Sequence, residues 1–206
     1  FWVTKVGTKK ICVVADCTGH GVPGGFMSML GMSFISQIIS KGESFHPGDI
    51  LNQLRTSVIN SLHQTGEIGS SKDGMDIAIY VIDEETNILE FSGANNPLVH
   101  IRNNELNHIK SDKMPIGIHM RADEPFSTHT IELLPGDCIY TFSDGYVDQF
   151  GGPDQRKFMI KNFKDLLLEI HQLPMAEQRE RLHKNLLDWH GTSPRIDDVV
   201  VMGVRI

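Results

Sequence analysis

The chain has 206 residues, of which 40% are hydrophobic and 22% are charged, and its formal net charge is -7. This is the composition of a globular protein with a substantial core, and the length suits a single domain. The negative charge argues against nucleic acid or an anionic membrane surface as the main partner. An acidic protein that handled a phosphate ester would need a cation in its site.

The cysteine content excludes two further classes of protein. Cys12, Cys17 and Cys138 are odd in number and show no C-x-x-C spacing, so neither a disulfide framework nor a zinc site is indicated. No secretory signal is visible, and no apolar run approaches the roughly 18 residues of a membrane span. A reducing cytoplasm is therefore the expected location. Because the chain opens on Phe1 inside a strand pattern, we expect a fragment of a longer protein.

The first predicted elements form a hairpin that leads to a carboxylate. Residues 1–6 and 10–15 read as strands on either side of the turn at residues 7–9. Asp16 follows the second strand and precedes a glycine-rich turn. A tight turn near Thr8 would place Asp16 opposite the position just before Phe1. Cross-strand neighbours stand about 5 Å apart, so an acid at that position would share a site with Asp16.

Asp16 needs a partner, because a carboxylate beside a core is costly unless it is hydrogen-bonded, paired or metal-bound. Three interpretations are open at this point. Asp16 could form the turn or cap the next helix, the commonest role of Asp before glycine. The second interpretation is phosphate binding, because three glycines between residues 19 and 24 satisfy the dinucleotide-binding motif G-x-G-x-x-G. Two features weaken it. Pro23 interrupts the start of the helix, and residues 41–44 read as a loop where that motif expects an acidic residue at the end of the next strand. The third interpretation is a hard divalent metal bound by oxygen.

Two helices are predicted behind this turn. Pro23 stands at a first helical position, and helical spacing continues to about Ser40. A second helix from Pro47 to about His63 carries an apolar stripe, which indicates core or helix–helix packing rather than a cofactor site. Residues 65–74 are polar and rich in glycine and serine, and predict a mobile loop.

From Met75 the apolar period changes to two, which predicts an antiparallel meander followed by two further strands. The predicted strands cover residues 76–82, 88–92, 98–102, 105–109, 126–133 and 137–142, with a long loop at 111–125. Helices are expected at 163–171 and 174–189, before a terminal strand at 199–206. The elements together predict the α+β class, as a four-layer αββα sandwich of two stacked, mainly antiparallel sheets flanked by helix pairs.

Carboxylates recur where apolar strands meet loops. Asp144 follows the strand at 137–142, and Asp197 and Asp198 precede the last strand. Strand ends at one edge of a sandwich can converge, and oxygen ligands without histidine or thiolate suit magnesium or manganese better than zinc. Two such ions about 4 Å apart can neutralise a phosphate and generate a metal-bound hydroxide for in-line attack. Each Asp alone is more simply structural, but three such contexts favour a metal site.

Five motifs occur in a specific order: D-C-T-G-H-G-V-P-G-G at 16–25, S-G-A-N-N-P at 92–97, M-P-I-G-I at 114–118, P-G-D-C-I-Y-T-F-S-D-G at 135–145 and D-D-V-V-V at 197–201. Their combination, which covers nearly the whole chain, resembles the SpoIIE-like bacterial branch of the metal-dependent, type 2C-like (PPM) serine/threonine protein phosphatases. The resemblance implies an αββα sandwich with two divalent cations, manganese or magnesium. It also implies hydrolysis of phosphoserine or phosphothreonine without a phosphoenzyme.

The resemblance carries ligand roles to individual positions. Asp16 looks like the carboxylate that bridges both ions, and Cys17 like the residue that supplies a backbone carbonyl. Asp144 looks like the ligand of the S-D-G turn, and Asp197 like the last ligand, with Asp198 as the second choice. All five residues are therefore expected in the metal site.

Other positions carry weaker implications. Gly145 would matter for the turn rather than for the chemistry. His20 invites a role as general acid, because an unperturbed pKa of about 6.5 suits proton transfer to the leaving oxygen; an exposed turn histidine is the competing interpretation. Arg156 and Lys157 could steer a phosphoprotein or form a solvated loop. Nothing near Cys17 in sequence supplies a base, so a cysteine nucleophile is not expected.

One family ligand falls outside the chain. Members carry an acid just before the aromatic pair that Phe1-Trp2 resembles, and we expect it in the longer protein. Without it, the same fold would be a module that binds a phosphoprotein or a partner kinase without turnover, which is the alternative function. The presence of Asp16, Asp144 and Asp197 argues for the enzyme, and dinucleotide binding is a distant third.

The resemblance also implies partners. We expect one phosphatase domain over residues 1–206, C-terminal to a sensor or regulatory domain in the same chain. The expected substrate is a phosphorylated regulatory protein such as an anti-sigma-factor antagonist. The helices at 23–40 and 47–63 would act as a switch that assembles the metal site, for example through a homodimer. Nucleic acid and direct membrane contact are not expected for this cytoplasmic domain, although the full-length protein could be membrane-anchored.

Overall fold

The computed structural model describes residues 1–19, 21–42, 44–67 and 69–206. The chain forms two compact units, each built around one sheet. Unit 1 comprises Phe1–Pro97 and Lys110–Leu133, and unit 2 comprises Leu98–Ile109 and Leu134–Ile206. The predicted α+β class with two antiparallel sheets is confirmed.

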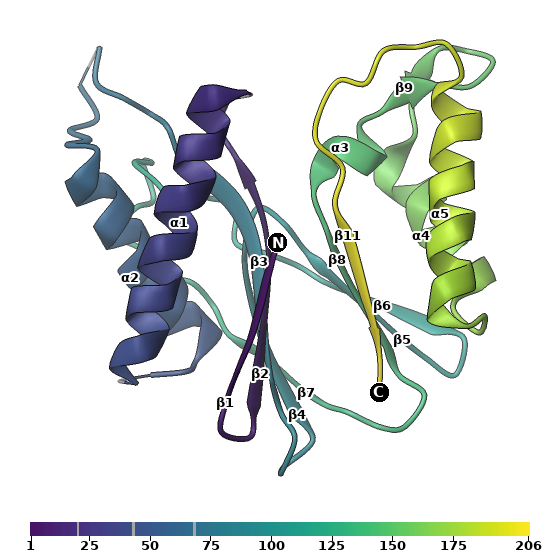
Figure 1. Cartoon of the computed structure of the whole chain (residues 1–206), viewed down its shortest axis with the longest axis horizontal. Helices are drawn as coiled ribbons and strands as arrows, with labels where there is room; N and C mark the ends of the chain where they lie inside the picture. Colours follow the sequence, from purple (N-terminus) through teal and green to yellow (C-terminus); the bar gives the residue numbers. More distant parts are fainter. Residues whose placement is uncertain (20, 43, 68) are drawn as a thin grey trace. The chain divides into compact units, whose positions relative to one another are not determined.

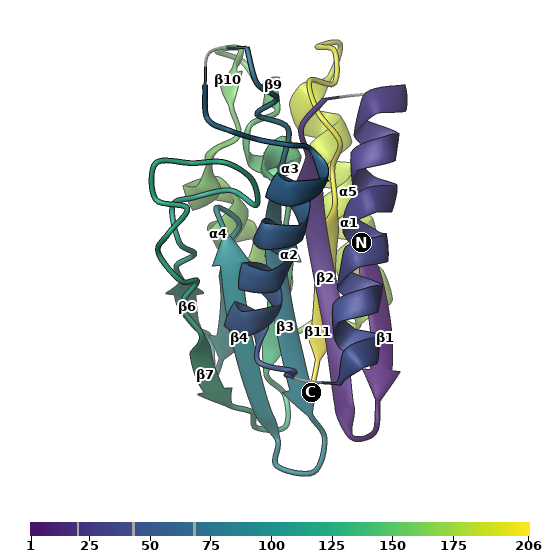
Figure 2. The ribbon, with the colours of Figure 1, turned by 90° about the vertical axis from the view of Figure 1, so that its left-hand side faces the viewer.

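Unit 1 contains a five-stranded antiparallel sheet with two helices on one face, as Figures 1 and 2 show. Its strand order is β1-β2-β3-β4-β7, with bounds Trp2–Val6, Lys9–Cys17, Met75–Asp83, Ile88–Ala94 and His129–Glu132. The helices are α1 (Val22–Lys41) and α2 (Pro47–Ser61).

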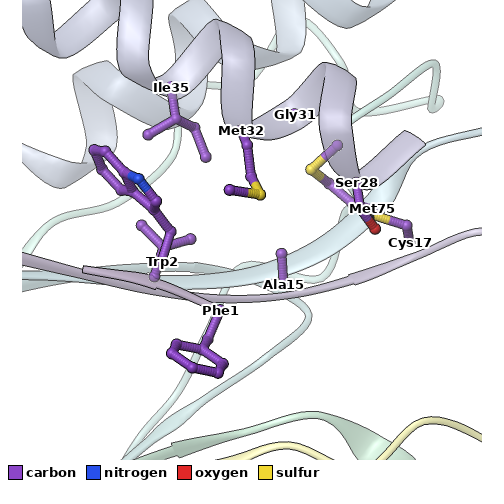
Figure 3. A pocket seen from close by; sticks show the side chains of 10 residues that line it. Phe1, Trp2, Ala15, Cys17, Ser28, Gly31, Met32, Ile35 and Met75 are labelled. Carbon is purple, nitrogen blue, oxygen red and sulfur yellow. Dashed lines mark hydrogen bonds between the residues drawn. The ribbon is translucent and has the colours of Figure 1, made fainter. Parts of the chain in front are cut away.

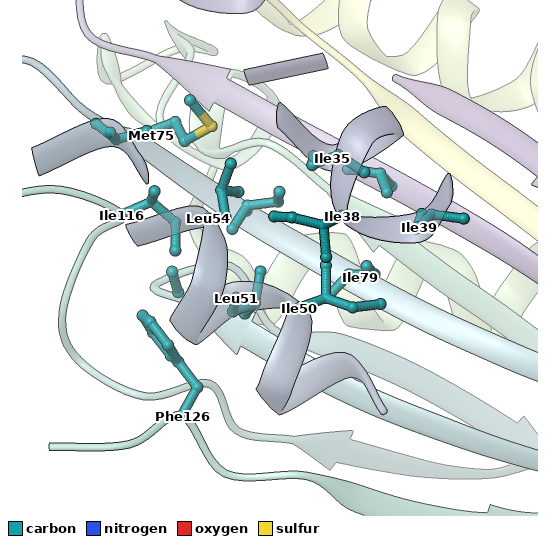
Figure 4. Packing of buried hydrophobic residues seen from close by; sticks show 14 of the residues in the cluster. Ile35, Ile38, Ile39, Ile50, Leu51, Leu54, Met75, Ile79, Ile116 and Phe126 are labelled. Atoms are coloured by element: carbon teal, nitrogen blue, oxygen red, sulfur yellow. The ribbon is translucent and has the colours of Figure 1, made fainter. Parts of the chain in front are cut away.

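The core of unit 1 lies between this sheet and the two helices. Alternate residues of β2 and β3 point toward the helices, which present branched aliphatic side chains in return (Figure 4). Burial of each such side chain stabilises the fold by about 1.5–3 kcal/mol. The fully buried members include Ile11, Ile50, Leu51, Leu54, Val58, Ile77 and Ile79. The apolar stripe predicted for α2 is therefore core.

Unit 2 contains a four-stranded antiparallel sheet of order β11-β8-β5-β6, with bounds Val201–Arg205, Cys138–Phe142, Leu98–Arg102 and Glu105–Ile109. Helices α4 (Met159–Ile170) and α5 (Met175–His190) pack against it. The short helix α3 (Asp144–Val147) follows β8 directly, and β9 (Phe150–Gly151) pairs with β10 (Arg156–Lys157). The core of unit 2 is rich in aromatic rings, among them Tyr140, Phe142, Tyr146, Phe158 and Phe163.

The predicted meander is wrong, because its strands divide between the two sheets. β3 and β4 pair in unit 1, whereas β5 and β6 pair in unit 2. The two strands expected at 126–133 and 137–142 do not pair with each other either, since β7 joins β4 and β8 lies between β5 and β11. Periodicity identifies a strand but not its partner, which is why local turn chemistry misassigned these pairs.

The first hairpin is one residue tighter than predicted. Its loop is Gly7-Thr8, with Gly7 at φ 59, and Lys9 already pairs with Val6. Two-residue hairpin loops use such positive φ values, which favour glycine. Trp2 consequently pairs with Val13, so the same register would place Asp16 opposite the second position before Phe1. The prediction that Asp16 faces the position directly before Phe1 is therefore wrong by one residue.

The length and composition of helix α1 differ from what was expected from the sequence. Among the described residues it is long and apolar enough to cross a membrane by length and composition, although no such run was expected. Core helices pass the same test, and Met27, Ile35, Ile38 and Ile39 of α1 are buried in the core of unit 1. The composition of α1 therefore has an explanation within unit 1.

Candidate metal centre

Asp16 is the second-last residue of β2, immediately before the strand gives way to the glycine-rich turn. The preceding residues, Ile11 to Val14, are buried, and Asp16 itself is half-buried. β2 continues through Cys17, so Asp16 is a strand residue and not the turn former of the first interpretation. After the strand, the hydroxyl of Thr18 accepts a hydrogen bond from the Gly74 N–H and donates one to the Gly74 carbonyl, each at 3.1 Å.

The glycine-rich turn after Asp16 requires glycine for its shape. Gly19 and Gly21 have φ values of 89 and 65, a region that residues with a Cβ rarely adopt. A Cβ on Gly24 would lie 2.6 Å from the carbonyl oxygen of Gly19. The element after α1 is α2, and β2 pairs antiparallel with β3. This topology is not the parallel βαβ unit of dinucleotide-binding proteins, so that interpretation is wrong.

The half-buried side chain of Cys17 lines a small pocket of about 50 Å³ in unit 1, between the sheet and α1 (Figure 3). Its lining includes Trp2, Ala15, Met32 and Met75. The Ser28 hydroxyl donates to the Cys17 sulfur at 3.4 Å. Burial raises the pKa of the Cys17 thiol, which disfavours the thiolate that a nucleophile requires. The backbone carbonyl, which is the predicted ligand, does not depend on the state of the thiol.

In unit 2, two of the predicted ligands come together. Asp144 is the first residue of α3 and directly follows β8, while Asp197 lies in the segment before β11. Both side chains are exposed, and one carboxylate oxygen of each lies within 4.8 Å of the other. The Asp198 N–H donates to Asp197 Oδ1 at 2.8 Å and so orients that carboxylate.

Gly145 has a different function from the one predicted. A Cβ at this position would lie 2.3 Å from the Asp198 carbonyl oxygen and 3.4 Å from Asp197 Cβ. Glycine is therefore needed for the close approach of the Asp197 segment to α3, rather than for the turn. The main-chain carbonyl of Asp198 accepts a hydrogen bond from the Ser143 hydroxyl at 3.0 Å.

The Asp144 and Asp197 pair fits a hard divalent cation. Ionised carboxylates are acceptors only, and two of them this close repel each other unless a cation or a proton intervenes. Oxygen donors at a solvent-accessible site suit magnesium, which keeps several waters when it binds protein carboxylates. The donor set thus fits a hard divalent cation bound by oxygen.

The remaining predicted residues stand outside this pair. His20 lies outside the described residues. Lys157 Nζ donates to Asp148 Oδ2 at 2.7 Å, so its charge is engaged within unit 2. The Arg156 side chain is 70% exposed, and its Nε lies 3.9 Å from Oδ2 of Asp154, whose side chain is equally exposed. An exposed pair of this kind leaves Arg156 available to solvent.

Sequence reasoning missed Asp76, which lies directly opposite Asp16 in the β2–β3 pair. Asn95 Nδ2 donates to Asp76 Oδ1 at 2.8 Å, and Asn95 itself has φ 59. The acid at the start of a predicted strand was a visible signal. Its pairing with Asp16 was not, because 60 residues separate the two positions and register is not encoded locally.

The family model of Stage II sporulation protein E (SpoIIE) matches residues 7–206. The chain belongs to the SpoIIE family. This membership confirms the resemblance to the SpoIIE-like branch, and solved PP2C phosphatase domains share the fold of the SpoIIE-family chain. The comparison with curated protein sequences yields no match.

Three solved structures show how far the likeness extends. The SiaA-PP2C domain of Pseudomonas aeruginosa has a TM-score of 0.88 and 27% identity, over 100% of this chain and 79% of that one. The PP2C phosphatase domain of Bacillus subtilis SpoIIE with a fragment of its regulatory domain has a TM-score of 0.77 and 16% identity, over 100% and 57%. RsbX in complex with magnesium has a TM-score of 0.64 and 16% identity, over 98% and 83%.

These likenesses place the SpoIIE-family chain in the PP2C-like α+β sandwich class. The chain spans little more than half of the SpoIIE structure that it matches. The family is that of PP2C-type phosphatase domains, and one solved relative holds magnesium.

Proposed function

We propose that the SpoIIE-family chain is a metal-dependent phosphatase that hydrolyses phosphoserine or phosphothreonine on a regulatory protein. The observation that carries the proposal is the Asp144–Asp197 pair, whose carboxylate oxygens lie within 4.8 Å of each other. Both residues stand at the positions where the family motifs supply ligands. Family membership over residues 7–206 supports the same chemistry.

The proposed centre holds two manganese or magnesium ions. Asp144 and Asp197 would bind from unit 2, Asp16 would bridge both ions, and Cys17 would add its backbone carbonyl, with Asp198 as a weaker candidate. When bound, the ions would neutralise the phosphate and activate a water for attack. The chain's own carboxylates would orient the ions. Without cations, these side chains and the net charge of -7 would repel a phosphate ester.

Proton transfer to the leaving oxygen needs a separate group. His20 is proposed for this role, because a histidine titrates near neutral pH and stands four residues from Asp16 in the glycine turn. Cys17 is not proposed as a nucleophile, because burial raises the pKa of its thiol. Hydrolysis would therefore proceed by direct attack of water, without a covalent enzyme intermediate.

The proposed substrate is a phosphorylated protein such as an anti-sigma-factor antagonist, and regulation is proposed to come from a sensor domain in a longer chain. Helices α1 and α2 are proposed to form the switch, in a homodimer or against that domain. Val22, Phe26 and Met29 of α1 are 71%, 67% and 69% exposed. An apolar helix face of this kind supports a protein contact there.

The test is hydrolysis of para-nitrophenyl phosphate by the full-length natural protein, with manganese, with magnesium and with chelator. We expect turnover that chelator abolishes and that Asp144→Asn reduces strongly. Asp154→Asn, which changes an exposed carboxylate of unit 2 that forms a loose pair with Arg156, is the matched control and should retain activity. Absence of turnover in every condition from folded protein would contradict the proposal and favour a binding module.

A further inference from the structure

The segment that carries Asp197 has no regular secondary structure of its own. Residues 191–200 form neither helix nor strand, and β11 starts only at Val201. Figure 1 shows the segment as the yellow loop that runs from α5 past α3 into β11. Asp197 therefore depends on side-chain and loop contacts for its distance from Asp144.

A single buried hydroxyl links the segment that carries Asp144 to the segment that carries Asp197. Ser143 is 1% exposed and stands between β8 and α3. Its hydroxyl donates to the Asp198 carbonyl at 3.0 Å and accepts the Val200 N–H at 3.1 Å. The Ser143 N–H also donates to the Val200 carbonyl, at 3.0 Å.

The sequence neighbours of these contacts are the proposed ligands. Ser143 immediately precedes Asp144, and Asp198 immediately follows Asp197. The hydroxyl thus joins the two ligand-bearing segments at one residue from each carboxylate. Gly145 permits the approach, because any Cβ there would collide with the Asp198 carbonyl.

A second side chain holds the other end of the segment. Gln149, also 1% exposed, donates from Nε2 to the Pro194 carbonyl and to the Phe150 carbonyl, each at 3.0 Å. The Gln149 carbonyl accepts the indole N–H of Trp189 at 2.9 Å. The segment is therefore fixed to the residues around α3 on both sides of Asp197.

We propose that Ser143 and Gln149 are positioning residues that hold Asp197 at the distance from Asp144 that a shared cation requires. The proposal rests on the proposed metal-dependent function. Neither side chain is assigned a contact with an ion or with substrate. Groups that orient metal ligands in this way commonly contribute about 10–100-fold to metal affinity or activity.

The experiment compares Ser143→Ala with Thr141→Val in the full-length protein. Thr141 lies two residues earlier at the end of β8, is 0% exposed, and its hydroxyl has no hydrogen-bond partner within the described part of the chain. Both changes remove one buried hydroxyl, but only the first removes the tie to Asp198. Manganese binding measured by calorimetry without substrate should weaken about 10–100-fold in Ser143→Ala and stay unchanged in Thr141→Val.

Kinetics and rescue separate positioning from a merely structural role. For Ser143→Ala we expect kcat to recover at high manganese, with an unchanged KM for para-nitrophenyl phosphate. Ser143→Thr keeps the hydroxyl and should recover most of the metal affinity. In an Asp197→Asn background, Ser143→Ala should cause little further loss, because the ligand that it positions is already removed. Gln149→Met should weaken manganese binding in the same direction.

Hydrogen exchange tests the tie without any metal. The Val200 amide should exchange at least about 10-fold faster in Ser143→Ala than in wild type, the equivalent of losing a hydrogen bond. Unchanged exchange would overturn the proposal, and so would faster exchange with unchanged manganese affinity. Failure of the proposed function gives a different result: wild type itself would show neither manganese binding nor turnover, and the positioning role would be overturned with it. A circular-dichroism melt identifies any variant that does not fold, in which case Ser143→Thr decides.

Discussion

Asp16 on β2 lies directly opposite Asp76 on β3, so two acids face each other near the end of the unit 1 sheet. Directly paired residues of an antiparallel sheet point to the same face, with Cβ atoms about 5 Å apart. Like charges at this distance are unfavourable, and Asn95 Nδ2 stabilises the Asp76 carboxylate by a hydrogen bond of 2.8 Å. The metal-free protein therefore carries charge repulsion at the position from which the proposed bridging ligand extends.

Neutralising Asp76 should relieve this repulsion. Asp76→Asn keeps the acceptor oxygen for Asn95, and we expect it to raise the free energy of unfolding of the metal-free protein by about 0.2–1 kcal/mol, the range for cross-strand charge pairs. Urea unfolding in chelator measures the effect. A variant less stable than wild type would show that Asp76 is held by favourable contacts that outweigh its repulsion with Asp16.

The close approach at Gly145 predicts a severe effect from one methyl group. Gly145→Ala would place Cβ 2.3 Å from the Asp198 carbonyl oxygen, which belongs to backbone and cannot rotate away. We expect a loss of about 1–3 kcal/mol in stability from overpacking and a loss of manganese-dependent turnover. The matched control is Gly25→Ala in α1, where an added Cβ meets nothing within 4 Å. Equal behaviour of the two variants would contradict the assigned reason for glycine at 145.

Much of the fold could be predicted from the sequence because its strong signals are local. The apolar run of β2, the start of α1 near Pro23 and the strands β5 and β6 follow from periodicity and turn residues within a few positions. The division of the strands between two sheets could not, because β4 and β5 are separated by one short turn and yet belong to different sheets. Each also takes a second partner far away in sequence, β7 for β4 and β8 for β5.

The candidate site likewise contains residues that local sequence signals identify and residues that depend on long-range pairing. Asp144 and Asp197 were predicted as ligands from strand ends and family motifs, and their carboxylate oxygens lie within 4.8 Å of each other in unit 2. Their role as ligands stays a prediction. Asp76 could not be identified, because its importance depends on the β2–β3 register. Ser143 and Gln149 were invisible for a related reason, since the atoms of the Asp197 segment that they bond lie 45 to 57 residues away in sequence.

The role assigned to Cys17 predicts tolerance to substitution. Its thiol lies in the pocket of unit 1 and contacts the Ser28 hydroxyl at 3.4 Å, whereas the proposed ligand is its backbone carbonyl. Cys17→Ala should therefore keep kcat and the manganese requirement near wild type, while Asp16→Asn should lose both. The measurement is para-nitrophenyl phosphate turnover against manganese concentration. Losses of the same size in both variants would instead implicate the thiol.

Asp137 predicts a pH dependence of stability in unit 2. Burial alone would raise the pKa of this carboxyl group, but hydrogen bonds from Arg102 and the Leu134 N–H, together with the imidazole of His100 at 3.1 Å, outweigh it and lower the pKa to about 2. The Arg102 contacts are 2.9 and 2.6 Å long, and Asp137 is 1% exposed. Because the folded pKa is below the ordinary value of 3.8, the stabilisation is present above about pH 4 and is lost as the pH falls toward 2.

Asp137→Asn tests this dependence. We expect the variant to be destabilised near neutral pH by about 3 kcal/mol, because it removes the buried carboxylate that accepts two hydrogen bonds from Arg102. The difference from wild type should shrink by about 2 kcal/mol between pH 4 and pH 2, where wild type takes up the proton. Urea unfolding across this range measures both quantities. A difference that stays constant with pH would contradict the lowered pKa of Asp137.

The buried guanidinium of Arg55 is expected to hold the long loop between β6 and β7 in place. Its Nη2 donates to the Glu124 carbonyl at 2.7 Å, and its guanidinium carbon lies 4.7 Å from the centre of the Phe126 ring. A lysine has neither the planar fork nor the same stacking geometry. Arg55→Lys should therefore destabilise unit 1 by about 1–3 kcal/mol, because the charge-assisted hydrogen bond from the buried guanidinium to the Glu124 carbonyl is lost. Thermal and urea unfolding measure the loss.

The same loop offers the control for this change. Arg121 pairs with the Glu124 side chain at the surface, where its own side chain is 41% exposed. Surface pairs of this kind contribute little, so Arg121→Lys should leave the unfolding midpoint where it is. If Arg55→Lys were equally silent, the loop would be held by the backbone bridge between Met75 and Ile116 and by apolar packing of Met114 and Phe126. The buried arginine would then be a consequence of the loop position rather than its cause.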